Sequence, residues 1–146
     1  MGFADDIRKF ALKCTRRHDD IAKNTVVKIA AALIERTPVG DSSYWVSPAP
    51  PGYTGGHARM NWNHSTGAPE FSEILGVDPS GAVSLARVMS SVAASKSGSV
   101  HYIFNSVPYF NRLENGYSPQ ALPNGIIGLT AMEFTQHFEA ATEVSK

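Results

Sequence analysis

Two histidines, His57 and His64, are the first residues of this sequence whose type and spacing could do chemistry. They stand seven positions apart in a segment rich in Gly and Asn, and imidazole is a common zinc ligand. A zinc site needs three or four closely spaced ligands, however, and no cluster of Asp, Glu or Cys accompanies this pair. The sequence therefore predicts no metal site. The single Cys14 excludes a multi-cysteine zinc site and an internal disulfide.

Patterns for covalent or acid–base catalysis are weak. There is no Gly-x-Ser-x-Gly elbow, and Cys14 falls on the apolar side of a predicted helix, where cysteine is usually a small hydrophobe. The glycines of residues 52–56 lack the following Lys-Ser/Thr of a phosphate-binding loop. Glu70 and Glu73 lie one helical turn apart, a spacing typical of a solvated face. We therefore expect no enzymatic activity and no cofactor.

The charge pattern favours neither nucleic acid nor a membrane surface as a partner. The 13 basic and 13 acidic residues give zero net charge, and no apolar run approaches the ~20 residues of a membrane span. Residues 1–36 carry eight basic and five acidic residues, whereas residues 37–146 carry five and eight. A split of +3 against −3 suits head-to-tail contact between copies, and it also arises by chance.

Residues 3–36 are predicted to form one long amphipathic helix. Its stripe recurs at three- and four-residue steps and comprises Phe3, Ile7, Phe10, Cys14, His18, Ile21, Thr25, Ile29 and Leu33. Thr37-Pro38 ends it, because the residue before proline disfavours the α region. Such a helix would be about 50 Å long, more than one compact domain needs. We expect either a kink near residues 16–20 or a protruding end that packs on a neighbour.

Residues 38–80 contain six prolines and six glycines, a density typical of irregular chain. Two short strands are expected there, one at Tyr44–Val46 and one in which Met60, Trp62 and His64 alternate with asparagines. We treat the chain as a single domain, 1–146, in which residues 40–76 form an extended arm. Such an arm could become ordered against a partner.

The rest of the chain predicts helix, strand, turn and helix. The second helix spans about 81–95 with Ser80 as its N-cap, and its expected buried stripe is Ala82, Leu85, Ala86, Met89, Val92 and Ala93. A strand begins at Val100, and a closing helix spans about 128–144, with Leu129, Phe134, Phe138, Ala141 and Val144 near one side. The expected fold is α+β with a small, mainly antiparallel sheet and a long extended arm.

Turn residues organise the stretch 101–128. Pro108 stops the strand, Gly116 is a natural left-handed C-cap, and Pro119 and Pro123 set the path to the final helix. Glu114 stands among aromatic residues. It is either an anchor, which accepts backbone N–H groups or pairs with Arg59, Arg87 or Arg112, or a solvent-facing turn residue.

The order of short motifs resembles the tail completion, or head–tail joining, proteins of long-tailed double-stranded-DNA bacteriophages. These motifs are Thr37-Pro38-Val39, Thr54-Gly55, Arg59-Met60-Asn61-Trp62, Asn105-Ser106-Val107-Pro108-Tyr109, Leu113-Glu114-Asn115-Gly116-Tyr117-Ser118, Gln120-Ala121, Pro123-Asn124-Gly125 and Glu133-Phe134. The resemblance covers most of the chain and is strongest over residues 100–138. In the family the first two motifs lie close together, whereas here residues 40–53 separate them, an insertion rich in Pro, Ser and Tyr.

The resemblance implies a virion protein without enzymatic activity, assembled in the host cytoplasm. It would form a ring, often sixfold, between the tail tube and the head connector. Its partners would be other copies of itself, the connector or adaptor proteins and the tail tube or terminator, with DNA only passing through. The expected structural and interface residues are Tyr44, Trp45, Tyr53, Arg59, Trp62, Tyr109, Glu114 and Gly116.

Two alternatives remain open from the sequence. A tail terminator that caps the tube would share the ring plan, so the motifs do not separate it from a tail completion protein. A small adaptor outside the virion, which uses the arm to recognise one protein, would form a one-to-one complex without rings.

Overall fold

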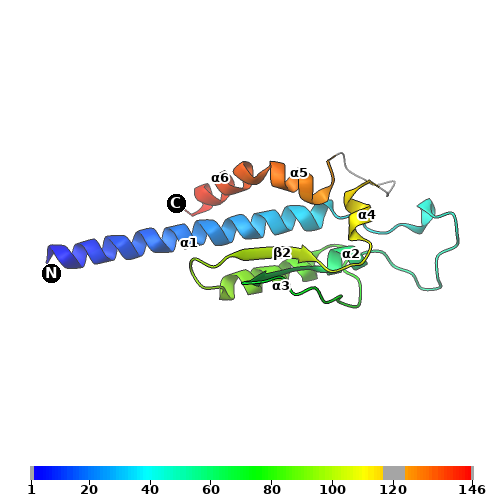
Figure 1. The fold of residues 1–146 in the computed structure, drawn as a ribbon, viewed down its shortest axis with the longest axis horizontal. Helices are drawn as coiled ribbons and strands as arrows, with labels where there is room; N and C mark the ends of the chain where they lie inside the picture. Colours follow the sequence, from blue (N-terminus) through cyan, green and yellow to red (C-terminus); the bar gives the residue numbers. More distant parts are fainter. Residues whose placement is uncertain (1, 117–123, 146) are drawn as a thin grey trace.

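The chain folds as an α+β protein, as predicted, with helices around a small antiparallel sheet (Figure 1). The computed structural model describes residues 2–116 and 124–145. The path predicted for Pro119 and Pro123, and the motif residues Tyr117, Ser118, Gln120 and Ala121, lie outside the described residues. The elements are α1 (Phe3–Arg36), the 3-10 turn η1 (Ser42–Tyr44), α2 (His57–Met60), β1 (Trp62–Thr66), α3 (Ala82–Ala94), β2 (His101–Asn105), α4 (Phe110–Glu114), α5 (Ile126–Met132) and α6 (Phe134–Val144).

The long helix α1 runs without a break, and its N-terminal half extends beyond the rest of the molecule (Figure 1). Of the two sequence-based alternatives, a kink or a protruding end, the structure has the protruding end. The apolar stripe there lies in water, with exposed fractions of 82% at Phe3, 52% at Ile7 and 67% at Phe10. The C-terminal half instead packs on the body, with Thr25, Ala30, Leu33 and Ile34 buried, and the helix ends at Thr37 as predicted.

Strands β1 and β2 pair antiparallel, with a register from Trp62 opposite Asn105 to Thr66 opposite His101. The predicted strand through Trp62 and His64 is therefore confirmed, although Met60 belongs to α2. The predicted strand at Tyr44–Val46 is wrong. Residues 42–44 form a 3-10 turn, because the Asp41 carboxylate accepts the Ser43 N–H at 2.9 Å and holds the chain in a tight bend.

Helix α3 lies where it was predicted, but of its predicted buried stripe only Val92 is buried, with Leu85 partly buried against the core. The buried residues are Ser84, Val88 and Val92, whereas Met89 is 49% exposed. The reason is close packing rather than hydrophobicity alone, since the Ser84 hydroxyl donates to the Arg59 carbonyl oxygen at 2.6 Å. Small side chains on the buried face of α3 let this helix pack closely on α1 and β1. Much of the stripe predicted to be buried therefore faces outward.

The predicted cap of α3 at Ser80 is also displaced by one residue. Gly81 is the N-cap, with φ of +78°, and a Cβ there would lie 2.2 Å from a methyl carbon of Ile34 on α1. Only glycine fits this close approach. The Ser80 hydroxyl still accepts the Ala82 N–H at 3.3 Å, and the Asp78 carboxylate accepts the Ser84 N–H at 2.8 Å.

The closing helix is two helices, α5 and α6, that meet at Glu133. The prediction of one helix over 128–144 is wrong at this break. Arg36 of α1 binds both carboxylate oxygens of Glu133, at 2.6 and 2.7 Å, and lowers the pKa of that carboxyl. Along α6 only Ala141 is buried, so the expected apolar side is largely exposed.

The core has two parts that share the C-terminal half of α1. One joins the sheet to α4 and α5 and comprises Leu33, Ile34, Ala58, Trp62, Val107, Phe110 and Ile126. The other joins α1 to α3 through Ala30, Val88 and Val92. Both parts lie on the C-terminal side of residue 25, so the protruding half of α1 contributes nothing to them.

The segment 40–76, predicted as one extended arm, projects from the body only in part. Residues 57–66 are α2 and β1 and belong to the body, with Trp62 only 1% exposed. Residues 41–54 form a loop that projects at the end opposite the N-terminus (Figure 1). Its two ends touch, since a Cβ on Gly55 would lie 2.2 Å from the carbonyl oxygen of Gly40. The inserted residues therefore form a loop whose two ends are in contact, and the body continues on either side of it.

Replacing residues 41–54 by a Gly-Ser linker should leave the fold intact. None of these residues is buried, and shortening a closed loop changes its entropy only slightly, so we expect a stability change below about 1 kcal/mol. Thermal unfolding followed by circular dichroism measures this. Loss of the cooperative transition would show that the loop is part of the folding unit.

Candidate functional site

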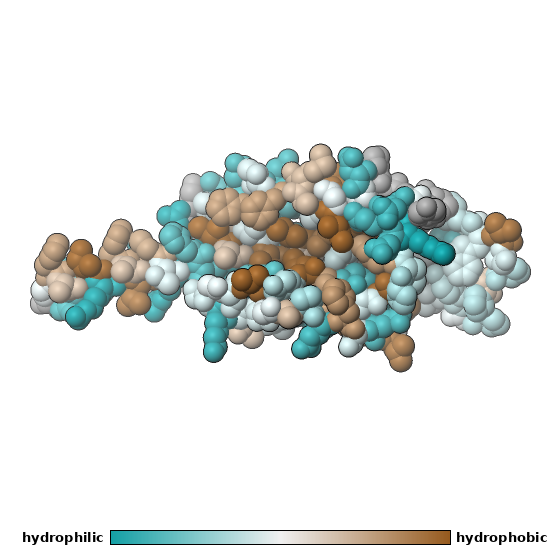
Figure 2. Space-filling view, viewed as in Figure 1, coloured by the Kyte–Doolittle hydropathy of each residue, from teal (hydrophilic) through white to brown (hydrophobic). Residues whose placement is uncertain are grey.

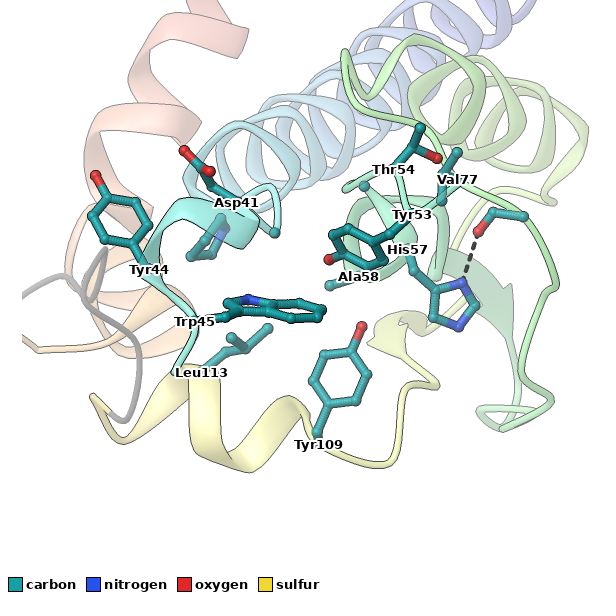
Figure 3. A pocket seen from close by; sticks show the side chains of 14 residues that line it. Asp41, Tyr44, Trp45, Tyr53, Thr54, His57, Ala58, Val77, Tyr109 and Leu113 are labelled. Carbon is teal, nitrogen blue, oxygen red and sulfur yellow. Dashed lines mark hydrogen bonds between the residues drawn. The ribbon is translucent and has the colours of Figure 1, made fainter. Parts of the chain in front are cut away.

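An aromatic pocket of about 840 Å³ lies between the loop 41–54, α2 and α4. It gathers four of the residues expected at an interface: Tyr44, Trp45, Tyr53 and Tyr109. Figure 3 shows that Trp45, Tyr53 and Tyr109 surround a common space, with Tyr44 at its rim. The structure therefore brings together aromatic residues that are up to 65 positions apart in the chain (109 − 44).

The loop itself builds one wall of the aromatic pocket. The rings of Trp45 and Tyr53 have centroids 4.7 Å apart, tilted by 53°. The Tyr53 hydroxyl sits where a Cβ of Gly40 would be, 2.1 Å away, so a side chain at position 40 would displace this wall. Both aromatic residues remain accessible, with exposed fractions of 42% and 38%. They are available to an incoming partner.

The opposite wall carries the polar groups of the pocket. The ring nitrogens of His57 bind the Gly76 carbonyl oxygen and the Glu73 carboxylate, each at 2.7 Å. The Glu73 hydrogen bond, followed by the Gly76 carbonyl, raises the pKa of His57 above its ordinary value. Burial, together with the neighbouring Tyr53 and Glu73, raises the pKa of the Tyr109 phenol, which stays a neutral hydrogen-bond donor. This lining suits an apolar or aromatic side chain of a partner.

Inside the body, a hydrogen-bond relay connects Ser91 of α3, His64 of β1 and His101 of β2. His64 lies 2.7 Å from the Ser91 hydroxyl through Nδ1 and 2.9 Å from Nδ1 of His101 through Nε2. One neutral tautomer satisfies every partner: His64 Nδ1–H donates to Ser91, Ser91 donates to the His64 carbonyl oxygen at 3.2 Å, and His101 donates to His64 Nε2. The relay ties α3 to the sheet.

We expect the relay to make the fold sensitive to acid. Burial, and secondarily His101, lowers the pKa of His64 below its ordinary 6.5, so the unfolded chain takes up the proton more readily. The stability present above pH 6.5 should fall as the pH drops through the folded-state pKa. Thermal unfolding across this range should show the loss in the native chain and not in His64→Gln. The exposed His18→Gln is the control and should retain it.

His57 should act in the opposite direction. Because its pKa is raised, it contributes stability that is present below pH 6.5 and lost as the pH rises through its folded-state pKa. His57→Gln should therefore make the acid loss steeper. A shallower loss in that variant would contradict the assignment.

Two of the expected residues, Arg59 and Trp62, make their contacts inside the chain. The Arg59 guanidinium donates to three carbonyl oxygens, of Thr37 at 2.8 Å, Glu35 at 2.9 Å and Pro79 at 2.6 Å. It thereby joins the end of α1 to the segment before α3. Trp62 donates its indole N–H to the Thr37 hydroxyl at 2.7 Å and is almost fully buried.

Glu114 anchors the start of α5 in one of the ways predicted for it. Its carboxylate accepts the backbone N–H groups of Ile126, Ile127 and Gly128, at 2.8, 2.8 and 2.9 Å. These are the donors that a helix leaves unpaired at its first turn. Gly125 makes this possible, since a Cβ there would lie 2.4 Å from the carboxylate and its φ is +76°.

For two of the three arginines predicted as alternative partners, Arg59 and Arg87, the guanidinium groups bind elsewhere. Arg59 binds the carbonyls described above, and Arg87 donates to the carbonyl oxygens of Met60 and Trp62. Gly116, after α4, has φ of +86°, as predicted for a left-handed helix end.

Glu114→Gln should destabilise the protein by about 1–3 kcal/mol, because the amide replaces one acceptor oxygen and leaves a backbone donor without its partner. Chemical denaturation measures the change. Glu70→Gln, at an exposed position, is the matched control and should cost little.

Sequence reasoning missed a second hollow, an apolar groove of about 560 Å³ between α1, β2 and the α5–α6 pair. It is lined by Ala22, Thr25, Val26, Ile29, Leu33, His101, Ile103, Ile127, Thr130, Ala131, Phe134 and Phe138. Figure 2 shows hydrophobic residues gathered along the middle of this face. The apolar side of the closing helix is the sequence feature that could have indicated this groove. Phe134 and Phe138 were predicted only to lie near one side of that helix, and they line the groove while remaining 52% and 46% exposed.

No family model, curated protein or solved structure matches the chain. The residues described by the structure contain no group of three or more His, Cys, Asp or Glu side chains that could hold a metal ion. None of the described helices has the length and apolar composition that crossing a membrane requires.

Proposed function

We propose that this chain is a structural protein of the bacteriophage head–tail junction, a tail completion or neck protein that assembles into a ring. The ring joins the tail tube to the head connector and lets DNA pass, and six copies are expected from the family that the sequence resembles. In this proposal the protein works by contact between copies and neighbours, without covalent chemistry.

The observation that carries the proposal is the protruding half of α1. Phe3, Ile7 and Phe10 are 82%, 52% and 67% exposed, so the chain on its own leaves a stripe of large apolar side chains in water. The aromatic loop 41–54 lies at the opposite end of the molecule (Figure 1). Two different exposed surfaces at opposite ends suit head-to-tail contacts, which close into a ring when the rotation between copies allows it.

The contact between the two ends of the loop 41–54 also supports the resemblance to the tail completion family. The motifs Thr37-Pro38-Val39 and Thr54-Gly55 are separated in the sequence by the insertion of residues 40–53. In space they meet, because a Cβ on Gly55 would lie 2.6 Å from a methyl carbon of Val39. The two motifs thus lie side by side, as they do along the chain in the resembled family.

Disruption of the gene for this chain in its phage tests the proposed role. We expect DNA-filled heads and complete-length tails to accumulate separately, and the native chain supplied from a plasmid to restore joined particles. Normal joined virions in the absence of the chain would contradict the role. Tails of uncontrolled length would instead identify a terminator that caps the tube.

The aromatic pocket favours the adaptor alternative to a smaller extent. A pocket that gathers Trp45, Tyr53 and Tyr109 could hold one side chain of a single protein partner. A stable one-to-one complex, with no ring under any condition of assembly, would favour that function over the neck role.

A further inference from the structure

The protruding half of α1 has the pattern of a helix that needs a partner. Phe3, Ile7, Phe10 and Cys14 follow one another at steps of four, three and four residues, which places them on one side. Isolated helices shorter than about 12–15 residues are marginal in water, and most helical stability in proteins comes from packing an apolar face. Here the body offers no such packing.

The apolar groove between α1, β2 and α5–α6 is a surface of matching character. Its outer wall carries Phe134 and Phe138, which are 52% and 46% exposed and stack with centroids 6.3 Å apart. Its floor is formed by α1 residues such as Ile29 and by Ile103 of β2, which pack on the core beneath. The groove thus offers a firm apolar base and a partly uncovered aromatic wall.

We infer that this groove is the seat for the N-terminal half of α1 from a second copy of the chain. The inference rests on the proposed self-assembly and names the surface through which it occurs. The dimensions agree: the groove follows α1 from Ala22 to Leu33, and the stripe runs from Phe3 to Cys14. Each covers 11 residue steps (33 − 22 and 14 − 3), or about 16 Å at the helical rise per residue.

The charges beside the two surfaces also agree. Residues 8–17 of the protruding half carry five basic residues and no acidic one. The described residues 124–145, which include the outer wall of the groove, carry three acidic residues and no Lys or Arg. Opposite charges around an apolar contact favour this pairing over the pairing of two basic helices with each other.

A ring fixes the direction in which the helix lies. In a head-to-tail ring every copy has the same orientation apart from the rotation between neighbours, so the incoming helix runs broadly along α1 of its host. Cys14 then lies toward the end of the groove at Ile127 and away from Ala22. The loop 41–54 of the host faces the body of the copy that supplies the helix.

Crosslinking from the native Cys14, the single cysteine of the chain, tests the seat directly. A second cysteine is introduced in the full-length chain at the groove, as Ile127→Cys or Ala22→Cys, or away from it on α3, as Ser90→Cys. All three positions are exposed. After mild oxidation, mass spectrometry of mixed heavy and light chains identifies disulfides between different copies.

The expected result is an inter-chain disulfide from Cys14 to Ile127→Cys, formed about tenfold or more above Ser90→Cys, because docking raises the local concentration of the two thiols. A dominant bond to Ala22→Cys would support the seat but reverse its direction, which contradicts the ring. Cys14–Cys14 bonds, or oligomers without groove crosslinks, would overturn the seat and leave self-assembly standing. A chain that stays monomeric and uncrosslinked would overturn both.

Discussion

Replacing Phe3, Ile7 and Phe10 together by glutamine should convert the assembled protein into folded monomers. Burying each such side chain contributes roughly 1.5–3 kcal/mol, so the triple variant should lose about 4 kcal/mol or more per contact. That corresponds to a dissociation constant about a thousandfold weaker. Glutamine is a good helix former, and these residues lie outside both parts of the core, so the fold should persist. Sedimentation velocity measures the assembly, and thermal unfolding measures the fold.

The same helix provides a matched control for this prediction. Leu12 is 59% exposed and lies two residues, or about 200°, from Phe10 around the helix. Leu12→Gln removes comparable apolar surface from the opposite side and should leave assembly nearly unchanged, whereas Phe10→Gln alone should weaken it. Equal effects of the two single changes would mean that the stripe is not the contact surface.

The second large effect is expected at Trp62, where a substitution should reduce the stability of the fold. Its ring is almost fully buried, makes an edge-to-face contact with Phe110 at 5.2 Å between centroids, and donates a hydrogen bond to Thr37. Trp62→Ala should therefore destabilise the protein by about 3–5 kcal/mol, the usual cost of removing a buried aromatic side chain. Denaturant-induced unfolding measures the change.

The other tryptophan is the control, since the chain contains two. Trp45→Ala removes a ring that is 42% exposed in the loop, and stability should change little. Trp62→Phe should fall between the two, because it keeps an aromatic ring and loses the indole N–H. If Trp45→Ala reduced stability more than Trp62→Ala, the loop 41–54 would belong to the folding core. That result would contradict its description as a loop outside the core.

Local chemistry made part of the fold predictable. Thr37-Pro38 ended α1 where the structure ends it, because the constraint acts on neighbouring residues alone. Gly116 adopts the left-handed conformation for the same reason. Glu114 was predicted as an anchor from its setting, although the sequence left open whether backbone N–H groups or an arginine would be its partner, and that choice depends on the path of the chain before α5.

Predictions that needed knowledge of the neighbouring elements failed. The buried face of α3 is set by the close approach of Gly81 to Ile34 and by the Ser84 hydrogen bond, and hydrophobic periodicity contains neither. Along α1 the same stripe is buried at one end and exposed at the other, since burial depends on where the body ends. The groove beside Phe134 was missed because it forms between α1, β2 and the α5–α6 pair, which are far apart in the sequence.

Imaging of the neck in phage particles that carry this chain tests the central claim most directly. We predict a closed ring of identical copies between connector and tail tube, in which the N-terminal helix of each copy crosses onto the next and DNA passes through the centre. A neck in which the chain is absent, or present as a single copy with its N-terminal helix uncovered, would contradict the account.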